Sequence, residues 1–463
     1  MSDKTIETAT PQISLAERTR RLHLVFRRMK RNSLALVVGN SEKTRSNDTT
    51  FTFRPSSDVL WLTGFPEPDA AIVLHKTSKN EEKVLLFVRP KDPERETWTG
   101  FREGPQGARQ KYFATEAYLV DEFEKVVGEL LPKAAWVYYK FGRNYEYDAR
   151  FRRLHEQNQR PLLNPETIIH RERMIKSSEE IAIIRHAAKI SAKAHELAMM
   201  RCGKDGGSLS EYNLRATLHY HFDDNGASYT AYDTIVANGN NACTLHYTTC
   251  RDALTSGSLV LIDSACEFAG YASDITRTFP VNGKFTEAQR EIYDLVLAAQ
   301  MSAIAYARAG RTINQVHAQA SKVLRAGLLK LGVLSKEMRS ERSEKLAIER
   351  AKAQGKEKEL LTLKTLFMHG TSHLMGLDVH DVAVHELRQE NYKSSRMKAG
   401  WIFTVEPGLY FPENDSRMPE RYRGIGVRIE DDILISADGC EVLTNGVTKQ
   451  PEEIEALMAK GRN

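Results

Sequence analysis

The sequence predicts an α/β amino-terminal domain, residues 1–172, followed by an α+β carboxyl-terminal domain, residues 173–463. Length is the first reason, because a single hydrophobic core stops growing near about 250–300 residues and this chain has 463. Short apolar runs then alternate with helical patterns in the first third, whereas later helix pairs alternate with strand-like runs that end in carboxylates. We place the boundary near Pro161 and Pro165, which interrupt regular structure.

The first domain opens with an amphipathic pattern, which predicts a helix over Ser14–Met29. Apolar runs of four or five residues follow and predict buried strands, with helix-like segments between the later ones. The strands are expected at Leu34–Val38, Ala70–Leu74, Val84–Val88 and Trp136–Tyr139, and the helices at Tyr118–Leu131 and Tyr147–Gln157.

The second domain opens with Ser177-Ser-Glu-Glu180, a capping box whose side chains satisfy the first backbone N–H groups of a long helix. A second capping box, Thr286-Glu-Ala-Gln289, opens another helix that Gly310 closes. Each of these helices is followed by a further helical pattern, at Ser210–Phe222 and Ile313–Leu331. The order predicts a duplicated helix pair with strands, and the charged stretch at about 336–364 reads as a surface insertion.

Composition limits the partners and the compartment. A net charge of +5 is small for this length and does not indicate nucleic-acid binding. The five cysteines show no CxxC pair, which favours free thiols in a reducing compartment. No apolar stretch approaches the roughly 18 residues of a membrane span. We therefore expect a cytoplasmic protein that acts without a membrane.

A carboxylate hairpin is the first candidate site. The apolar run Leu259–Ile262 predicts a buried strand that ends at Asp263, and a turn should place Asp274 on the opposite arm. Two facing carboxylates either share a proton or share a metal ion. Because an Asp at a strand end is more often a turn residue, the hairpin alone leaves the structural interpretation open.

Three downstream residues, His373, Glu406 and Glu430, extend this candidate, and both glutamates again end apolar runs. Four carboxylates supply four negative charges, which balance two divalent cations. Oxygen donors with one imidazole suit Mn²⁺, with Zn²⁺, Co²⁺ and Fe²⁺ as competitors. Bridging carboxylates hold such ions about 3.5–4 Å apart, a spacing used in metal-assisted hydrolysis.

Four segments carry a resemblance to a known family: LIDSACEFAGYASDITRTFPVNGKFT, HGTSHLMGLDVHD, TVEPGLY and RGIGVRIEDD. Their wording and order resemble the pita-bread dinuclear metallopeptidases, which include methionine aminopeptidase, prolidase and aminopeptidase P, and are closest to bacterial aminopeptidase P. The resemblance runs from about Arg45 to Met458. It implies a pita-bread fold for the second domain, with antiparallel strands around a dinuclear metal site.

The resemblance also implies roles for individual residues. It makes Asp263, Asp274, His373, Glu406 and Glu430 the metal ligands. Glu406 would shuttle a proton, while His246 and His380 would stabilise charge on the substrate carbonyl. Residues expected to bind substrate or to orient the ligands are His369, Arg428, Tyr410, Asp48 and Trp98, with Arg173 and Arg396 as weaker candidates.

The function implied is that of a Mn²⁺-dependent exopeptidase that releases the amino-terminal residue from peptides with proline in second position. A prolidase, which cleaves Xaa-Pro dipeptides with the same metal set, is the nearest alternative. A metal-free binding protein on the same fold is a more distant one, which the presence of all five ligands opposes. The resemblance further implies a homo-oligomer, either a dimer or a tetramer.

Overall fold

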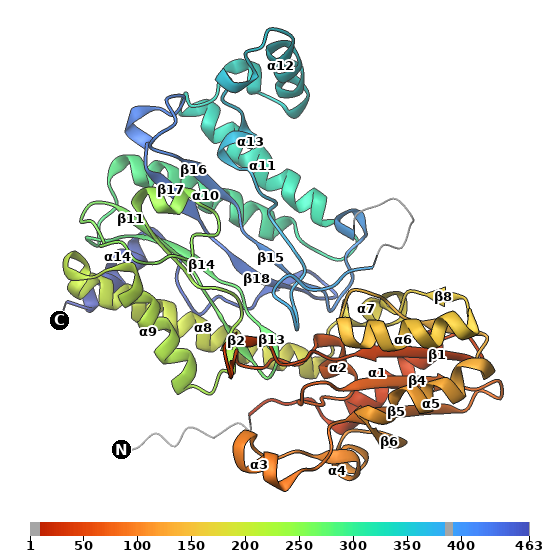
Figure 1. The fold of residues 1–463 in the computed structure, drawn as a ribbon. Coiled ribbons are helices and arrows are strands. Elements are labelled where there is room, and N and C mark those ends of the chain that lie inside the picture. Colours follow the sequence, from red (N-terminus) through yellow and green to blue (C-terminus); the bar gives the residue numbers. More distant parts are fainter. Residues whose placement is uncertain (1–9, 385–391, 463) are drawn as a thin grey trace. The chain divides into compact units, whose positions relative to one another are not determined.

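The computed structural model describes residues 10–384 and 392–462. The chain divides into two compact units, Ile13–Arg173 and a second that begins at Met174 (Figure 1). The predicted boundary after residue 172 lies one residue from this division. Among the described residues, no helix is long and apolar enough to cross a membrane.

A six-stranded mixed sheet in the order β6-β5-β4-β1-β7-β8 forms the centre of the amino-terminal unit. The central pairs β1–β4 and β4–β5 are antiparallel, whereas β6, β7 and β8 add in parallel. Every residue of β1 is buried, so both faces of the sheet are covered. The strands are β1 (Ser33–Val38), β4 (Ala71–Lys76), β5 (Glu82–Val88), β6 (Glu116–Leu119), β7 (Trp136–Tyr138) and β8 (Leu162–Leu163), with a separate hairpin of β2 (Thr44–Ser46) and β3 (Thr49–Thr50).

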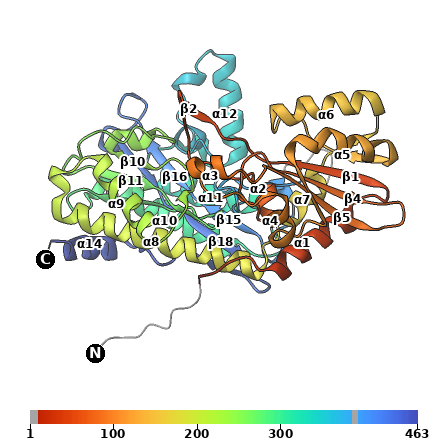
Figure 2. The same cartoon turned by 60° about the horizontal axis from the view of Figure 1, so that its bottom comes forward.

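Helices cover both faces of this sheet (Figure 2). On one face, Phe123, Val127 and Phe151 of α5 and α6 join alternate residues of β1 in one core. On the other lies α1, whose Ser14 hydroxyl caps the helix by accepting from the Glu17 N–H. The helices are α1 (Leu15–Arg28), α2 (Ser57–Leu62), α3 (Pro93–Thr99), α4 (Gly104–Lys111), α5 (Phe123–Leu130), α6 (Tyr145–Asn158) and α7 (Glu166–Arg173).

One helix expected in this unit is shorter than predicted. Tyr118 and Leu119 belong to strand β6, and the helix α5 begins only at Phe123. The pairing of β6 with β5 explains the difference, because the Tyr118 ring stacks on Phe87 with centroids 5.5 Å apart. Tertiary packing outweighs the local helical pattern at this edge.

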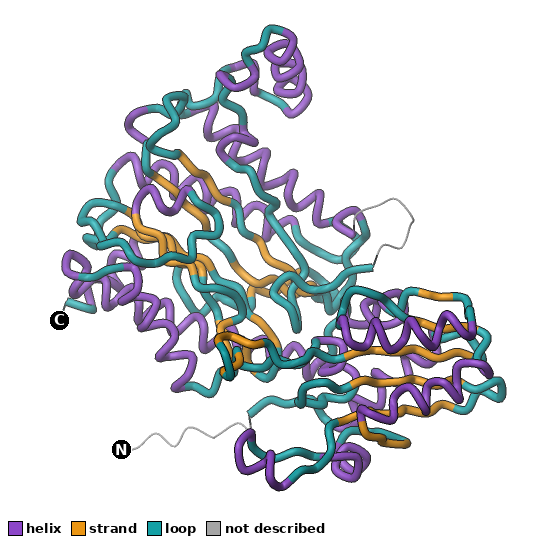
Figure 3. Tube along the Cα trace, viewed as in Figure 1, coloured by secondary structure: helices purple, strands orange, loops and turns teal. Residues whose placement is uncertain are grey.

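The second unit is built from short strands joined by long loops, with helices outside them (Figure 3). Its first half has the helix pair α8 and α9, and α8 packs against β12. Strand β11 lies between β10 and β14 with antiparallel neighbours on both sides. The elements are α8 (Ser178–Asp205), α9 (Glu211–Asp224), β9 (Tyr229–Thr230), β10 (Ile235–Asn238), β11 (Leu259–Asp263), β12 (Cys266–Phe268), β13 (Tyr271–Ala272) and β14 (Thr276–Pro280).

The second half repeats this order with a second helix pair, α10 and α11, followed by strands. Helix α10 packs against β15, β16 and β17, and the isolated bridge between Thr276 and Glu430 joins the two halves. The elements are α10 (Glu287–Tyr306), α11 (Ile313–Lys330), α12 (Glu341–Ala353), α13 (Leu363–Leu366), β15 (Ile402–Val405), β16 (Gly408–Phe411), β17 (Ile425–Arg428), β18 (Asp431–Ile435), β19 (Cys440–Val442) and α14 (Pro451–Lys460).

The helix starts of this unit confirm the sequence prediction. Ser177 with Glu180, and Thr286 with Gln289, form complete capping boxes at the starts of α8 and α10. The charged stretch contains helix α12, in which only Glu344 and Ala347 are buried. Asp274 lies in the short irregular segment that leads into β14, and Asp263 pairs with Thr276 of β14.

Candidate metal centre and active site

Five potential metal ligands, Asp263, Asp274, His373, Glu406 and Glu430, line a single cavity in the second unit, and we refer to them as the ligand set. Three of them come from or beside a short strand, whereas Asp274 and His373 lie in irregular segments. Asp263 ends β11, Glu406 directly follows β15, and Glu430 directly precedes β18. The two halves of the unit therefore bring their carboxylates together at one point.

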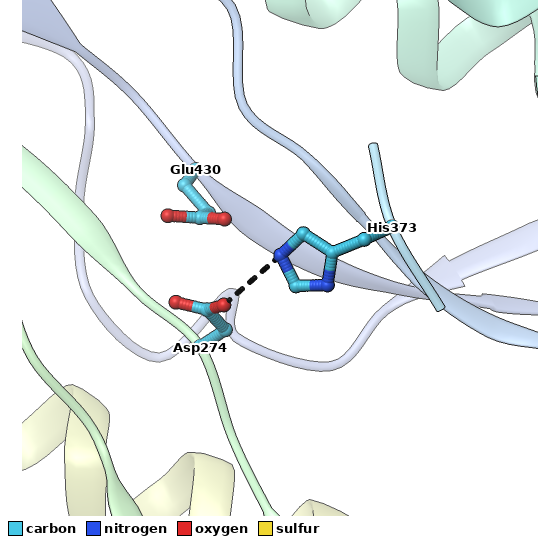
Figure 4. A group of neighbouring side chains, drawn as sticks. All are labelled: Asp274, His373 and Glu430. Atoms are coloured by element: carbon cyan, nitrogen blue, oxygen red, sulfur yellow. Dashed lines mark ion pairs between the residues drawn. The ribbon is translucent and has the colours of Figure 1, made fainter. Parts of the chain in front are cut away.

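Three members of the ligand set converge most closely (Figure 4). One donor atom each from Asp274, His373 and Glu430 lies within 4.8 Å of the other two. The His373 Nε2 atom is 3.4 Å from Asp274 Oδ2 and 3.7 Å from Glu406 Oε1. These separations suit a cation between the donors, since two ligands of one ion with bonds of about 2.1 Å lie up to twice that distance apart.

The His373 ring is oriented by its backbone surroundings. Its Nδ1 lies 3.2 Å from the Leu374 carbonyl oxygen, which fixes Nδ1 as the donor and turns Nε2 towards the carboxylates. Its backbone N–H donates to the Thr404 hydroxyl at 3.2 Å, and the Thr404 N–H returns a bond to the His373 carbonyl. This is how a metal-binding imidazole is commonly held, with the second ring nitrogen donating to a carbonyl.

Arg428 begins a chain of hydrogen bonds that links several of the predicted site residues. Its guanidinium donates to Asp263 Oδ2 at 2.7 Å and to the Tyr410 hydroxyl at 3.0 Å. The Tyr410 hydroxyl lies 2.7 Å from His369 Nε2, and His369 Nδ1 is 3.4 Å from Glu406 Oε2. The chain of contacts runs from one carboxylate of the ligand set to another through these three side chains.

Burial and neighbouring charges shift the pKa values of Glu430, Glu406 and His373. Burial, followed by the neighbouring carboxylates, raises the pKa of Glu430 well above its usual range. Burial also raises the pKa of Glu406 to about 7, although the charges of His373 and Arg428 oppose this. For His373 burial lowers the pKa, but the bond to Asp274 and the charge of Glu406 outweigh it and raise it to about 9. An array of buried like charges of this kind is stabilised by cations.

The residues present fit divalent metal ions. Asp263 Oδ1 is buried and accepts no hydrogen bond from the described residues, although Oδ2 is held by Arg428. A buried carboxylate oxygen without a donor is costly, and a cation bound there would remove that cost. Four carboxylates and one imidazole form a donor set typical of a divalent metal centre.

The cavity has a volume of about 750 Å³, which is enough for a short peptide segment. The predicted catalytic residues His246 and His380 both line it. The His380 ring meets the His373 ring edge to face, with centroids 4.3 Å apart. Desolvation, followed by positive charge at His373 and at His246, lowers the pKa of His380 to about 4. His380 is therefore neutral near pH 7.

The segment that carries His380 is fixed by a buried ion pair. Asp381, the next residue, accepts from Lys176 Nζ at 2.8 Å, and both side chains are at most 2 % exposed. The Asp381 N–H donates to the Leu374 carbonyl at 2.8 Å, which closes the loop between the two histidines. The Gly376 Cα faces this pair, and a Cβ there would lie 2.3 Å from Asp381 Oδ2.

Three predicted substrate contacts lie in the amino-terminal unit. Asp48 is exposed in the turn between β2 and β3, and Trp98 near the end of α3 is 86 % exposed. Arg173 is buried and donates to Asp58 at 2.7 Å, which holds the pKa of that carboxyl well below its usual range against the effect of burial. Their roles towards substrate stay predictions. In the second unit, Arg396 is exposed and is not among the cavity-lining residues.

The sequence analysis missed several residues of the site. Tyr232 and Lys393 line the cavity, and no motif or spacing singled them out. Asp432 accepts from the Asp274 N–H at 3.0 Å and from the Ser273 hydroxyl at 2.9 Å, so it fixes the backbone of a ligand. The run Glu430-Asp431-Asp432 was a visible signal for this last role, because alternate residues of a strand reach the same face.

Comparisons with known proteins agree with this geometry. Residues 182–437 match the model of metallopeptidase family M24, and residues 17–138 match that of the aminopeptidase P amino-terminal domain. The chain is 40 % identical to the Xaa-Pro aminopeptidase of Escherichia coli, over 97 % of this chain and 99 % of that protein. It is 39 % identical to the Xaa-Pro aminopeptidase of Haemophilus influenzae, over 94 % of this chain and 95 % of that one.

Solved structures give the same result. The fold matches E. coli aminopeptidase P in a low-pH form with a TM-score of 0.88 and 39 % identity, over 98 % of this chain and all of that chain. It matches a Pseudomonas aeruginosa aminopeptidase with a TM-score of 0.87 and 38 % identity, over 97 % of this chain and 99 % of that chain. With its pita-bread second unit and its five converging donors, the chain belongs to metallopeptidase family M24.

Proposed function

We propose that this protein is a metal-dependent Xaa-Pro aminopeptidase, which releases the amino-terminal residue from peptides with proline in second position. The convergence of the ligand set in one peptide-sized cavity carries this proposal. The two bacterial relatives, which the chain matches over nearly its whole length, are both Xaa-Pro aminopeptidases.

Asp263, Asp274, His373, Glu406 and Glu430 would hold two divalent cations, and we assign Mn²⁺ to the site. Mn²⁺ suits four carboxylates and one imidazole, although a Zn-substituted E. coli aminopeptidase P also exists. When bound, such ions activate water for attack and polarise the substrate carbonyl. Arg428 holds Asp263, and Thr276 donates to Glu430 at 2.6 Å, so the chain itself orients both carboxylates.

The remaining steps fall to side chains that line the cavity. Glu406 takes a proton from the attacking water and delivers it to the leaving proline nitrogen. His380, kept neutral, donates a hydrogen bond to the scissile carbonyl oxygen as negative charge develops there. His246 lies on the same cavity and stabilises the same charge.

The proline ring would lie against the wall formed by His369 and its neighbours. The His369 ring contacts Phe367 edge to face at 4.9 Å and Tyr410 at 5.5 Å, so its position is fixed. Lys393 also lines this cavity and would attract the carboxyl-terminal part of the peptide. A rigid wall that fits the imide favours proline over other residues in second position.

Peptide length decides between this function and that of a prolidase. With Mn²⁺ added, an Xaa-Pro-Xaa tripeptide and an Xaa-Pro dipeptide are compared by kcat/KM. We expect the tripeptide to be the better substrate, and an Xaa-Ala-Xaa tripeptide to be cleaved poorly. Turnover restricted to the dipeptide would make the protein a prolidase, and equal rates on the two tripeptides would make it a general aminopeptidase.

Further assignments complete the proposal. Residues 1–172 form the amino-terminal domain, in which Asp48, Trp98 and Arg173 help to bind substrate, and residues 173–463 form the catalytic domain. The protein works in the cytoplasm as a homo-oligomer, either a dimer or a tetramer. Five free cysteines support a reducing compartment. Light scattering on the purified protein and localisation of a tagged chain test these two points.

A further inference from the structure

One buried glutamate outside the ligand set gathers four hydrogen bonds. Glu211, the first residue of α9, has no exposed surface. Its Oε1 accepts from the Asn238 N–H at 2.8 Å and the Asn241 side-chain amide at 2.9 Å. Its Oε2 accepts from the Tyr247 hydroxyl and the Asp252 N–H, both at 2.9 Å. All four donors belong to residues 238–252, which we call the His246 loop.

The His246 loop has little regular structure of its own. It contains a short 3₁₀ turn, Gly239–Cys243, and residues 244–252 form neither helix nor strand. Leu245, His246 and Thr248 of this loop line the active-site cavity, and His246 is exposed. A ladder of backbone bonds therefore does not set the position of His246, and another part of the molecule must do so.

The four donors saturate the carboxylate. Two carboxylate oxygens offer about four acceptor sites, and hydrogen bonds to an ionised acceptor are roughly twice as strong as neutral ones. The start of α9 also favours a negative charge, because the helix dipole is positive there. The Glu211 N–H donates to the Asp252 carbonyl at 2.9 Å and so closes the far end of the loop.

We propose that Glu211 is a positioning residue that sets the place of His246 at the substrate carbonyl. The connection from Glu211 to His246 is direct, because Tyr247, which donates to Glu211, is the residue after His246. This inference rests on the proposed function, because it gives His246 a role towards substrate. Glu211 touches neither the cavity nor the ligand set, so it acts through the loop alone.

The Glu211→Gln variant removes one acceptor oxygen while preserving volume. An amide accepts on one side and donates on the other, so one pair of loop donors would face N–H groups. We expect kcat to fall about tenfold, because displacing a group by roughly 1 Å costs up to 10² in rate. Bound metal should not change, because no ligand lies on the loop. Amide hydrogen exchange over residues 239–252 should become faster.

Two further variants separate positioning from general stability. Tyr247→Phe removes one of the four donors and should give a smaller change in the same direction. Glu344→Gln is the matched control, because Glu344 is also a buried glutamate that accepts a backbone N–H, that of Leu363 at the start of α13 at 2.7 Å, and it does not line the cavity. It should lower the melting temperature without affecting exchange in the His246 loop or kcat.

A double-mutant cycle gives the decisive result. If Glu211 acts through His246, then Glu211→Gln should lower kcat in the wild-type background and have no further effect in His246→Ala. An equal fold-loss in both backgrounds, or unchanged exchange in the loop, overturns the positioning role. A His246→Ala protein of full activity overturns the role of His246 itself, and the positioning proposal with it. Loss of activity in His246→Ala but not in Glu211→Gln overturns the positioning alone.

Discussion

Two carboxylates of the ligand set, Asp263 and Glu406, share a cavity with His246 and His380 but rest on a different kind of backbone. Asp263 and Glu406 lie at strand ends, and the surrounding sheet pairs hold them through backbone ladders. His246 and His380 lie in irregular segments. A buried acidic residue helps to hold each of these segments, Glu211 through neutral donors and Asp381 through Lys176.

The two kinds of backbone suit the different roles of the carboxylates and the histidines. Four carboxylates close together repel one another, so they need a backbone that stays in place whether or not cations are bound. The histidines meet the substrate, and loops can adjust around it. We therefore expect changes in the ligand set to remove metal, and changes in the loops to alter rate while metal stays.

The largest effect should come from removing a ligand charge. Asp263→Ala or Glu430→Ala should abolish measurable turnover and lower bound metal, because each carboxylate offsets half the charge of one cation. Metal content by plasma spectrometry and peptide hydrolysis test this together. Full activity with unchanged metal in either variant would show that the ligand set is wrong.

His380→Ala should lower kcat by about 10²–10³, the cost of losing one donor to a developing oxyanion. Metal content should remain, whereas His373→Ala should lose both rate and metal. Melting temperatures of both variants show whether either change is simply structural. A His380→Ala protein that loses metal as His373→Ala does would mean that the two histidines have the opposite roles.

The ion pair beneath His380 should matter for stability as well as rate. Lys176→Met removes the cation from a buried carboxylate, which typically costs about 3–5 kcal/mol of unfolding free energy. Denaturant titration measures this, and kcat reports the displacement of His380. The double variant Lys176→Met with Asp381→Asn should recover much of the stability, and a double variant less stable than Lys176→Met would contradict the account.

The smallest effect concerns His195 of α8, whose side chain has no exposed surface. Burial lowers its pKa to about 4, although the contact of Nε2 with the Ser264 carbonyl at 2.8 Å opposes this. Folding therefore favours the neutral form of the His195 ring. The contribution of His195 to the free energy of unfolding is complete above pH 6.5 and is lost as the pH falls towards 4. The full loss is at most about 3 kcal/mol.

His195→Asn should remove this part of the pH dependence. Urea titrations of both proteins between pH 7 and pH 4 give the pH dependence of the unfolding free energy for each, and all the other titratable groups are the same in the two proteins. Parallel slopes would show that His195 does not contribute.

The sequence indicated much of the ligand set because Asp263, Glu406 and Glu430 each end an apolar run, and the capping boxes gave the helix starts. It could not reveal contacts across long separations, such as Lys176 with Asp381 or Glu211 with the His246 loop. Nor could it place Tyr118 in a strand, because the stacking of Tyr118 on Phe87 depends on the assembled sheet. Sequence patterns report on residues close together in the chain, whereas this site joins residues from two halves that are far apart in the sequence.

Metal reconstitution of the wild-type protein tests the central claim most directly. Metal-free protein is titrated with Mn²⁺ while release of the amino-terminal residue from an Xaa-Pro-Xaa peptide is followed. The account predicts that activity appears with added metal and reaches its plateau at two equivalents per chain. Full activity without metal, or a plateau at one equivalent with no second ion bound, would contradict a dinuclear centre formed by the five residues of the ligand set.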